Sequence, residues 1–158
     1  MTDTTTPAPL PQAGLLRRLA AMIYDGLLLI AVIMAYTGLV TWINHLLRGP
    51  LEDDMPVYPG LWGLVVFAGM IGCVVGFFCL FWRRSGQTLG MKSWRMVLVD
   101  DDTGKVPSLK RCLWRCTLAG LSFATLGLGY LWQWFDPERL ALHDRLSRTR
   151  LLVVPKGR

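Results

Sequence analysis

The sequence LAAMIYDGLLLIAVIMAYTGLVTWI, residues Leu19–Ile43, decides the fold. It contains 25 residues and one charged side chain, Asp25, so it is apolar enough to enter a bilayer. A second stretch, Gly60–Trp82, contains 23 residues and no charged side chain. A helix of about 20 apolar residues crosses the hydrocarbon core of a membrane. Both stretches are therefore predicted to be transmembrane helices.

The composition of the whole chain favours the same class of protein. Of its 158 residues, 53% are hydrophobic and 18% are charged, which is apolar for a soluble domain. The net charge is +6, but the basic residues flank apolar spans and lack the interleaved aromatic residues of a nucleic-acid surface. We expect the lipid bilayer and its anionic headgroups as partners, and no nucleic acid.

The charges beside the two spans predict their orientation. Arg17 and Arg18 precede the first span, and residues 83–115 carry eight basic side chains against three aspartates. The positive-inside rule places both segments in the cytoplasm. Residues 44–59 contain three acidic side chains, three prolines and one glycine, so they are predicted to form an external loop.

Two terminal segments are predicted to lie outside the membrane domain. Residues 1–14 contain three prolines and three consecutive threonines, a composition that predicts a disordered tail. Residues 156–158 form a short C-terminal tail. The remaining residues, 15–155, are predicted to form one transmembrane domain.

A third apolar region, residues 113–135, admits two interpretations. Its 20 uncharged residues Cys116–Phe135 are enough for a single crossing, but that would place the basic tail 136–158 outside. A break near Gly120, Gly127 and Gly129 would instead return the chain as a helical hairpin. We prefer the hairpin, which leaves the C-terminus in the cytoplasm.

Two short apolar runs, Met96–Val99 and Leu151–Val154, are predicted to be strands that can pair as a small cytoplasmic β-ribbon. Ser108 is a plausible N-cap for a helix that begins at Leu109. The predicted fold class is an all-α membrane protein with two firm spans, a third broken or single span, and this possible ribbon.

One acidic side chain inside the first span is the main candidate for chemistry. Arg18 and Asp25 lie seven residues apart, so they share a helix face but stand about 10 Å apart and cannot bridge each other directly. A carboxylate in this position needs a partner, water or a proton. Asp25 is therefore either a cation or proton site or half of a structural salt bridge. The candidate counter-charges are Arg18, Arg111, Arg115 and Arg145.

The run Leu142-His143-Asp144-Arg145 combines an imidazole, a carboxylate and a guanidinium within one turn. It is able to relay protons at a membrane surface, and its alternative role is local capping. Because no Ser, Cys or second acid completes a hydrolase site, we do not expect an enzyme or a cofactor. Cys112 and Cys116 lack nearby histidines, so they are interpreted as small apolar residues and not as metal ligands.

Three glycines in the second span, Gly69, Gly72 and Gly76, recur on one face and allow close helix packing. We expect this face to pack within the chain, with Ala31 and Ala35 opposite, in preference to a homodimer contact.

Taken together, these motifs resemble the RDD family of bacterial membrane proteins, which is named for one arginine and two aspartates. Arg18, Ala21 and Asp25 fit the first-helix pattern R-x-x-A-x-x-x-D, and Asp144 fits the second aspartate. The segment Ser85–Lys92, SGQTLGMK, is similar to the family's loop after the second helix. The resemblance covers about residues 14 to 155.

The resemblance implies a bacterial inner-membrane protein that transports a ligand, with cation–proton exchange among the suggested activities. Our first hypothesis is a small transporter in which Asp25 and Asp144 bind a proton or cation and Arg18 competes for the carboxylates or orients them. On this hypothesis the chain forms a homo-oligomer. Our second hypothesis is a non-transporting scaffold. Its charges clamp the cytoplasmic ribbon to the helices, and its basic face binds a partner protein or anionic lipid.

Overall fold

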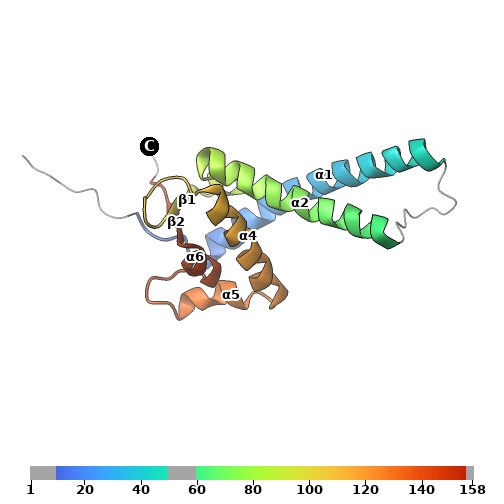
Figure 1. Cartoon of the computed structure of the whole chain (residues 1–158). Coiled ribbons are helices and arrows are strands. Elements are labelled where there is room, and N and C mark those ends of the chain that lie inside the picture. The colour runs from blue at the N-terminus through green and yellow to red at the C-terminus, as the bar shows by residue number, and fades with distance from the viewer. Residues whose placement is uncertain (1–9, 50–59, 156–158) are drawn as a thin grey trace, which may run out of the picture.

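Two long helices dominate the computed structural model, which describes residues 10–49 and 60–155. Helix α1 spans Leu15–Arg48 and helix α2 spans Gly60–Ser85. They contact each other and project away from the remaining elements, which gather at one end (Figure 1). The acidic residues of the predicted external loop, and most of the predicted tails, lie outside the described residues.

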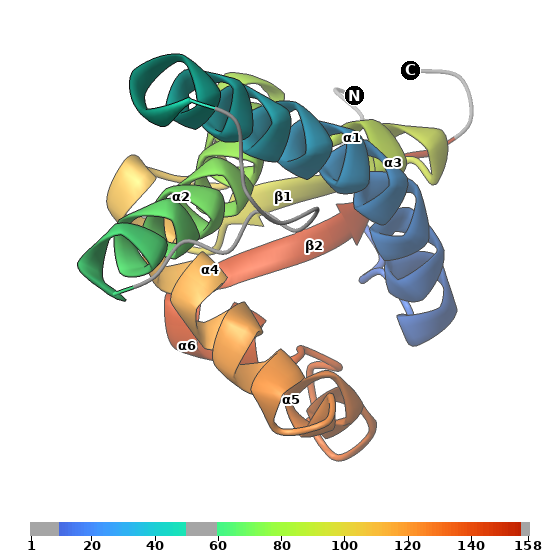
Figure 2. The same cartoon turned by 90° about the vertical axis from the view of Figure 1, so that its right-hand side faces the viewer.

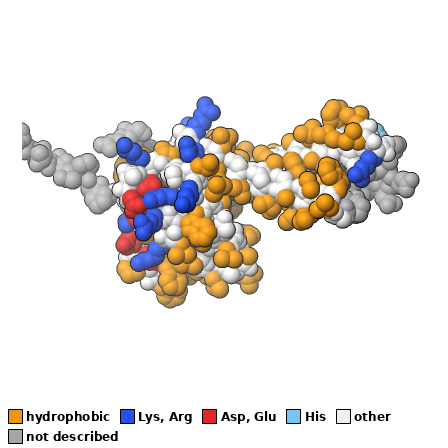
Figure 3. All heavy atoms as spheres, in the orientation of Figure 1, with side chains coloured by type: hydrophobic (Ala, Val, Ile, Leu, Met, Phe, Trp, Pro, Cys, Tyr) orange, Lys and Arg blue, Asp and Glu red, His pale blue; other side chains and the backbone are white. Residues whose placement is uncertain are grey.

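Both long helices have the properties of transmembrane helices. Each is long and apolar enough to cross a membrane, and almost none of its most apolar part is buried by the rest of the protein. Hydrophobic side chains cover the projecting part, while the acidic side chains gather at the opposite end (Figure 3). The two predicted spans are thus confirmed as helices, and α1 extends beyond the predicted span at both ends.

The packing between α1 and α2 uses one of the three predicted glycines. The Tyr36 hydroxyl donates a hydrogen bond to the backbone oxygen of Val66 at 2.9 Å. A Cβ atom at Gly69 would lie 2.1 Å from that hydroxyl oxygen, whereas Cβ atoms at Gly72 and Gly76 would meet nothing within 4 Å. The predicted glycine face is therefore corrected to Gly69 alone, and Tyr36 lies opposite it in place of the predicted alanines.

The predicted β-ribbon is present. Strand β1, Met96–Asp100, pairs antiparallel with β2, Thr149–Val153, with Met96 opposite Val153 and Asp100 opposite Thr149. A short helix, α3 (Leu89–Ser93), joins α2 to β1. Figure 2 shows the two strands side by side, behind the projecting parts of α1 and α2.

The end of the predicted disordered tail is ordered. Gln12 forms a β-bridge with Leu152. The Ala13 amide donates to the Leu151 oxygen at 2.8 Å, and the Val153 amide donates to the Pro11 oxygen at 2.9 Å. The ordered domain thus starts before residue 15, because the proline-rich composition does not prevent an extended segment from pairing with β2.

The third apolar region is bent and is not one straight helix. Helix α4, Leu109–Ala124, is followed by α5, Leu128–Leu131, and a 3₁₀ turn η1, Trp132–Trp134, at an angle of 106°. The chain turns at Leu126 and Gly127, which both have positive φ. A Cβ at Gly129 would lie 2.1 Å from the Ser122 hydroxyl, so glycine lets α5 fold back against α4. The broken form predicted from these glycines is the one observed.

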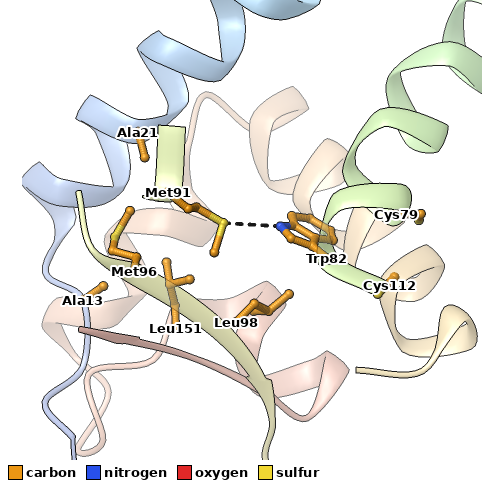
Figure 4. Packing of buried hydrophobic residues seen from close by; sticks show 9 residues of the cluster. All are labelled: Ala13, Ala21, Cys79, Trp82, Met91, Met96, Leu98, Cys112 and Leu151. Carbon is orange, nitrogen blue, oxygen red and sulfur yellow. Dashed lines mark hydrogen bonds between the residues drawn. The ribbon is translucent and has the colours of Figure 1, made fainter. Parts of the chain in front are cut away.

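The buried core lies where the strands meet the N-terminal part of α1 and the C-terminal part of α2. It contains Ala13, Ala21, Cys79, Trp82, Met91, Met96, Leu98, Cys112 and Leu151 (Figure 4). The Trp82 indole donates to the Met91 sulfur at 3.4 Å, which fixes α3 beside α2. The last helix, α6 (Leu142–Ser147), leads directly into β2. The core thereby includes the start of α1 through Ala21 and the strand that follows α6 through Leu151.

Candidate functional site

A fully buried carboxylate, Asp144, lies at the centre of the charged residues. It belongs to α6 and forms ion pairs with Arg18 of α1 and Arg115 of α4, one with each carboxylate oxygen. Both arginines are themselves nearly inaccessible to solvent. Because the three side chains come from three elements, this cluster fastens α6 to the helices α1 and α4.

Further contacts fix the two guanidinium groups. Arg18 Nε donates to the Ala13 oxygen at 2.9 Å, which links the cluster to the ordered N-terminal segment. Arg115 Nη1 donates to the Thr149 hydroxyl at 2.9 Å, and its guanidinium lies 5.1 Å from the centre of the Trp82 ring. The position of each arginine is thus determined by backbone, hydroxyl and aromatic partners as well as by Asp144.

The charged state of the cluster follows from burial and from its neighbours. Burial opposes ionisation of Asp144, but the adjacent Arg115 and Arg18 outweigh it and hold the pKa of Asp144 below its ordinary value. Burial lowers the pKa of His143 to about 3, which Asp144 only partly opposes. Asp144 is therefore ionised and the His143 imidazole is neutral at physiological pH.

Asp25 lies in a different environment. Its Oδ2 accepts a hydrogen bond from the Thr88 hydroxyl at 2.5 Å, and its Oδ1 accepts one from the Gly90 amide at 2.9 Å. A Cβ at Gly90 would lie 2.3 Å from the Ala21 backbone oxygen, so only glycine allows α3 to approach α1 this closely. Among the described residues, Asp25 has no basic partner within ion-pair distance.

The predicted site residues thus divide into two groups. Arg18, His143 and Asp144 come together, whereas Asp25 is held by α3. None of the four arginines proposed as counter-charges for Asp25 pairs with it, because each of these arginines pairs with another carboxylate. Arg18 and Arg115 pair with Asp144, Arg111 with Asp100 and Asp102, and Arg145 with Asp136.

Sequence reasoning missed the roles of Thr88, Gly90 and Thr149. The sequence signal for Thr88 and Gly90 is their place in the SGQTLGMK segment. This segment resembles the family's loop, but the resemblance does not say which residue each of them contacts. Arg115 was considered, but as a partner of Asp25. Its true partner was not evident because α4 and α6 are joined by the bent segment, whose path the sequence did not determine.

A cavity of about 750 Å³ lies between α1, α2 and α4. Its volume is within the range of sites that bind drug-sized ligands. Its lining is mostly apolar, and it also includes the charged residues Arg18, Asp25 and Arg115 as well as His143. Both groups of site residues therefore border the same space.

A metal centre is not apparent in this part of the molecule. Within residues 10–49 and 60–155, no group of three or more His, Cys, Asp or Glu side chains is placed to hold a metal ion. Cys112 is fully buried in the apolar core beside Trp82.

The apolar helices, the ion-paired Arg18 and Asp144, and the buried Asp25 together define a helical membrane protein with charged side chains buried beside its long helices. The chain belongs to the RDD family, which matches residues 12–148. It is also 33% identical over 89 residues to the uncharacterized protein RP437 of Rickettsia prowazekii (strain Madrid E). That match covers 56% of this chain and 49% of the relative, so the chain matches about half of the relative's length. No solved structure matches the chain.

Proposed function

We propose that this protein is a small transporter that binds its ligand in the cavity between α1, α2 and α4, with Asp25 as the group that binds a proton or cation. One observation carries the proposal: Asp25 lies on an apolar helix, borders the cavity and has no ion-pair partner among the described residues. Ionisable side chains inside membrane spans commonly mark ion and proton pathways.

In this proposal Asp144 has a different role from the one expected in our first hypothesis. Its two oxygens are occupied by Arg18 and Arg115, so a cation would have to displace a guanidinium to bind there. In this proposal Asp144 is a structural residue, and Arg18 holds Asp144 and does not compete for Asp25. His143 is a neutral neighbour of the cluster.

The proposed transporter acts in a bacterial inner membrane with both termini in the cytoplasm, in keeping with the basic segments beside α1 and α2. It acts as a homo-oligomer, because two long helices and one bent pair enclose little polar volume. A reporter that is active only in the cytoplasm, fused after Arg158, tests the topology. A signal supports it, and silence contradicts it.

Proton flux in liposomes tests the role of Asp25. Purified protein is reconstituted with a pH-sensitive dye inside the vesicles, and a cation gradient is then applied. We expect cation-dependent proton movement in the wild type, loss of it in Asp25→Asn, and no change in Asp102→Asn, which alters a half-exposed carboxylate. Undiminished flux in Asp25→Asn would exclude the role proposed for this residue.

A scaffold is the second candidate function, and the ion pairs of Asp144 favour it. They fix the end of the molecule that carries the β-ribbon and most of the charged side chains. This end would present a stable surface to a partner protein or to anionic lipid. On this alternative the wild type gives no flux, and Asp25→Asn lowers the abundance of the folded protein. Copurification from the membrane then identifies the partner.

A further inference from the structure

Four basic side chains at the end of α2 and around α3 have no counter-charge within the described part of the protein. Residues 60–99 contain no acidic side chain and four basic ones, Arg83, Arg84, Lys92 and Arg95. All four are exposed, and none forms an ion pair with a described residue. They are therefore free to bind a partner outside the chain.

The acidic side chains beside the β-ribbon already have partners. Residues 100–155 contain six acidic side chains, which gather beside the ribbon in Figure 3. Each of the six forms an ion pair with an arginine other than Arg83, Arg84 or Arg95. These acids would have to leave their present pairs to neutralise the charge on α2 and α3.

The two arginines of α2 lie next to the surface that faces lipid. Leu80, 62% exposed, is the last large apolar side chain of α2 that is exposed, and Arg84 follows it by one helical turn. One turn advances about 5.4 Å along the axis. The headgroup layer adds about 5–7 Å to each side of the hydrocarbon core of a bilayer. Arg83 and Arg84 are thus placed at the level of the headgroups.

The short helix α3 is fixed at the same level. The Gly90 amide donates a hydrogen bond to Asp25 at 2.9 Å, which holds α3 against the first turns of α1. The exposed side chains of this segment include Leu89 and Trp94 beside Lys92. Tryptophan prefers the headgroup layer, where its ring has both apolar and polar surroundings. The surface around α3 therefore combines apolar anchors with positive charge.

We infer that this surface, formed by the four basic side chains together with Leu89 and Trp94, binds the headgroups of anionic phospholipids in the adjoining leaflet. A cluster of four or more Lys and Arg side chains directly beside a membrane span attracts anionic lipid. The contact goes beyond ion transport by Asp25 and does not depend on it. It assigns the lipid contact to α2 and α3 and not to the β-ribbon, whose acidic side chains are paired within the chain.

Electron spin resonance of spin-labelled lipids measures this preference. Full-length protein is reconstituted in phosphatidylcholine vesicles with a trace of labelled phosphatidylglycerol or labelled phosphatidylcholine, and the immobilised fraction of each label gives their relative association constant. We expect the wild type to prefer phosphatidylglycerol by about threefold or more. The preference should vanish in about 1 M NaCl, which screens exposed charges. Equal association of the two lipids at low salt would overturn the lipid surface.

Two double variants remove the same charge from different places. Arg84→Gln/Lys92→Gln removes two charges from the proposed surface, whereas Lys105→Gln/Lys110→Gln removes two exposed and unpaired charges that follow β1. We expect the first variant to lose most of the preference for phosphatidylglycerol and the second to retain it. Equal losses would show that net charge sets the preference, and would overturn the site. Arg83→Gln/Arg95→Gln replaces the first variant should that variant not fold.

The lipid assay uses no ion gradient, so its result is separate from that of the flux assay. A preference for phosphatidylglycerol without flux would exclude the transporter and retain the lipid surface. Flux without the preference would do the reverse.

Discussion

Asp144 pairs with Arg18 and Arg115, which are 126 and 29 positions away from it in the sequence. One carboxylate therefore joins the start of α1, the middle of α4 and the helix that leads into β2. All three side chains are buried, so the free energy of this cluster depends on the presence of every member. Arg18 and Asp144, which resemble the family's arginine and second aspartate, are thus in direct contact in this protein.

Asp144→Asn should strongly destabilise the fold. The substitution leaves two buried guanidinium groups without a counter-charge, and the loss of one partner from a buried ion pair costs about 3–5 kcal/mol. Thermal unfolding in detergent, followed by tryptophan fluorescence, measures the change. Asp102→Asn is the control, because its pairs with Arg111 and Arg148 are partly exposed and screened by solvent, so their loss should barely change stability. Equal melting temperatures for the two variants would contradict this account.

Gly90→Ala should weaken the contact between α3 and α1. The new Cβ would lie 2.3 Å from the Ala21 oxygen and 2.9 Å from the Asp25 carboxyl carbon, so backbone has to move. Overpacking of this kind typically costs about 1–3 kcal/mol. Gly76→Ala, on a helix position with open space, should leave stability unchanged or raise it slightly. The same unfolding assay compares the two, and a neutral Gly90→Ala would show that the helices are not in close contact.

The membrane helices and the ribbon could be predicted from sequence because their signals are local. A long apolar run predicts a span without any knowledge of its neighbours, and β-branched and apolar runs such as Met96–Val99 predict strands. The break after α4 was also local, since Gly127 and Gly129 weaken a helix where they stand. These elements depend on composition and spacing over short distances.

The pairing of charges could not be predicted in the same way. Asp144 and Arg115 lie on separate elements joined by a bent segment, and nothing in their spacing distinguishes this pair from Asp144 with Arg111 or Asp25 with Arg115. The hydrogen bonds of Asp25 with Thr88 and Gly90 likewise depend on how α3 docks against α1. The ordering of residues 11–13 was hidden because their partner, β2, is at the other end of the chain.

Acidification should destabilise the protein through His143. Burial lowers its pKa to about 3 in the folded state, against an ordinary value of 6.5, so the unfolded state binds the proton more readily at intermediate pH. The free energy of unfolding is therefore unaffected by His143 above pH 6.5, and it falls by about 1.4 kcal/mol for each pH unit between 6.5 and the folded-state pKa. Melting temperatures between pH 7.5 and 5 measure the slope, because carboxyl groups titrate mainly below this range.

His143→Phe is the variant that isolates this effect. It retains an aromatic ring beside Tyr130, whose ring centre lies 4.6 Å from that of His143, but it cannot take up a proton. We expect a smaller loss of stability between pH 7.5 and 5 than in the wild type. An unchanged slope would show that His143 is not the group responsible.

Thr88→Val should separate the Asp25 hydrogen bond from the volume of the threonine side chain. Valine has nearly the same shape, but it cannot donate to Asp25 Oδ2 or accept from the Met91 amide, as the Thr88 hydroxyl does. A buried carboxylate oxygen and a helix N-terminus thus lose a partner together, which should cost about 1–3 kcal/mol in the unfolding assay. Thr88→Ser retains the hydroxyl and should recover most of the loss, whereas equal losses in both variants would point to packing of the methyl group as the cause.

If Asp25 also binds the transported proton, Thr88→Val should shift the pH dependence of flux. Thr88→Ser should leave this pH dependence near that of the wild type, because only the valine variant removes a hydrogen bond from the carboxylate.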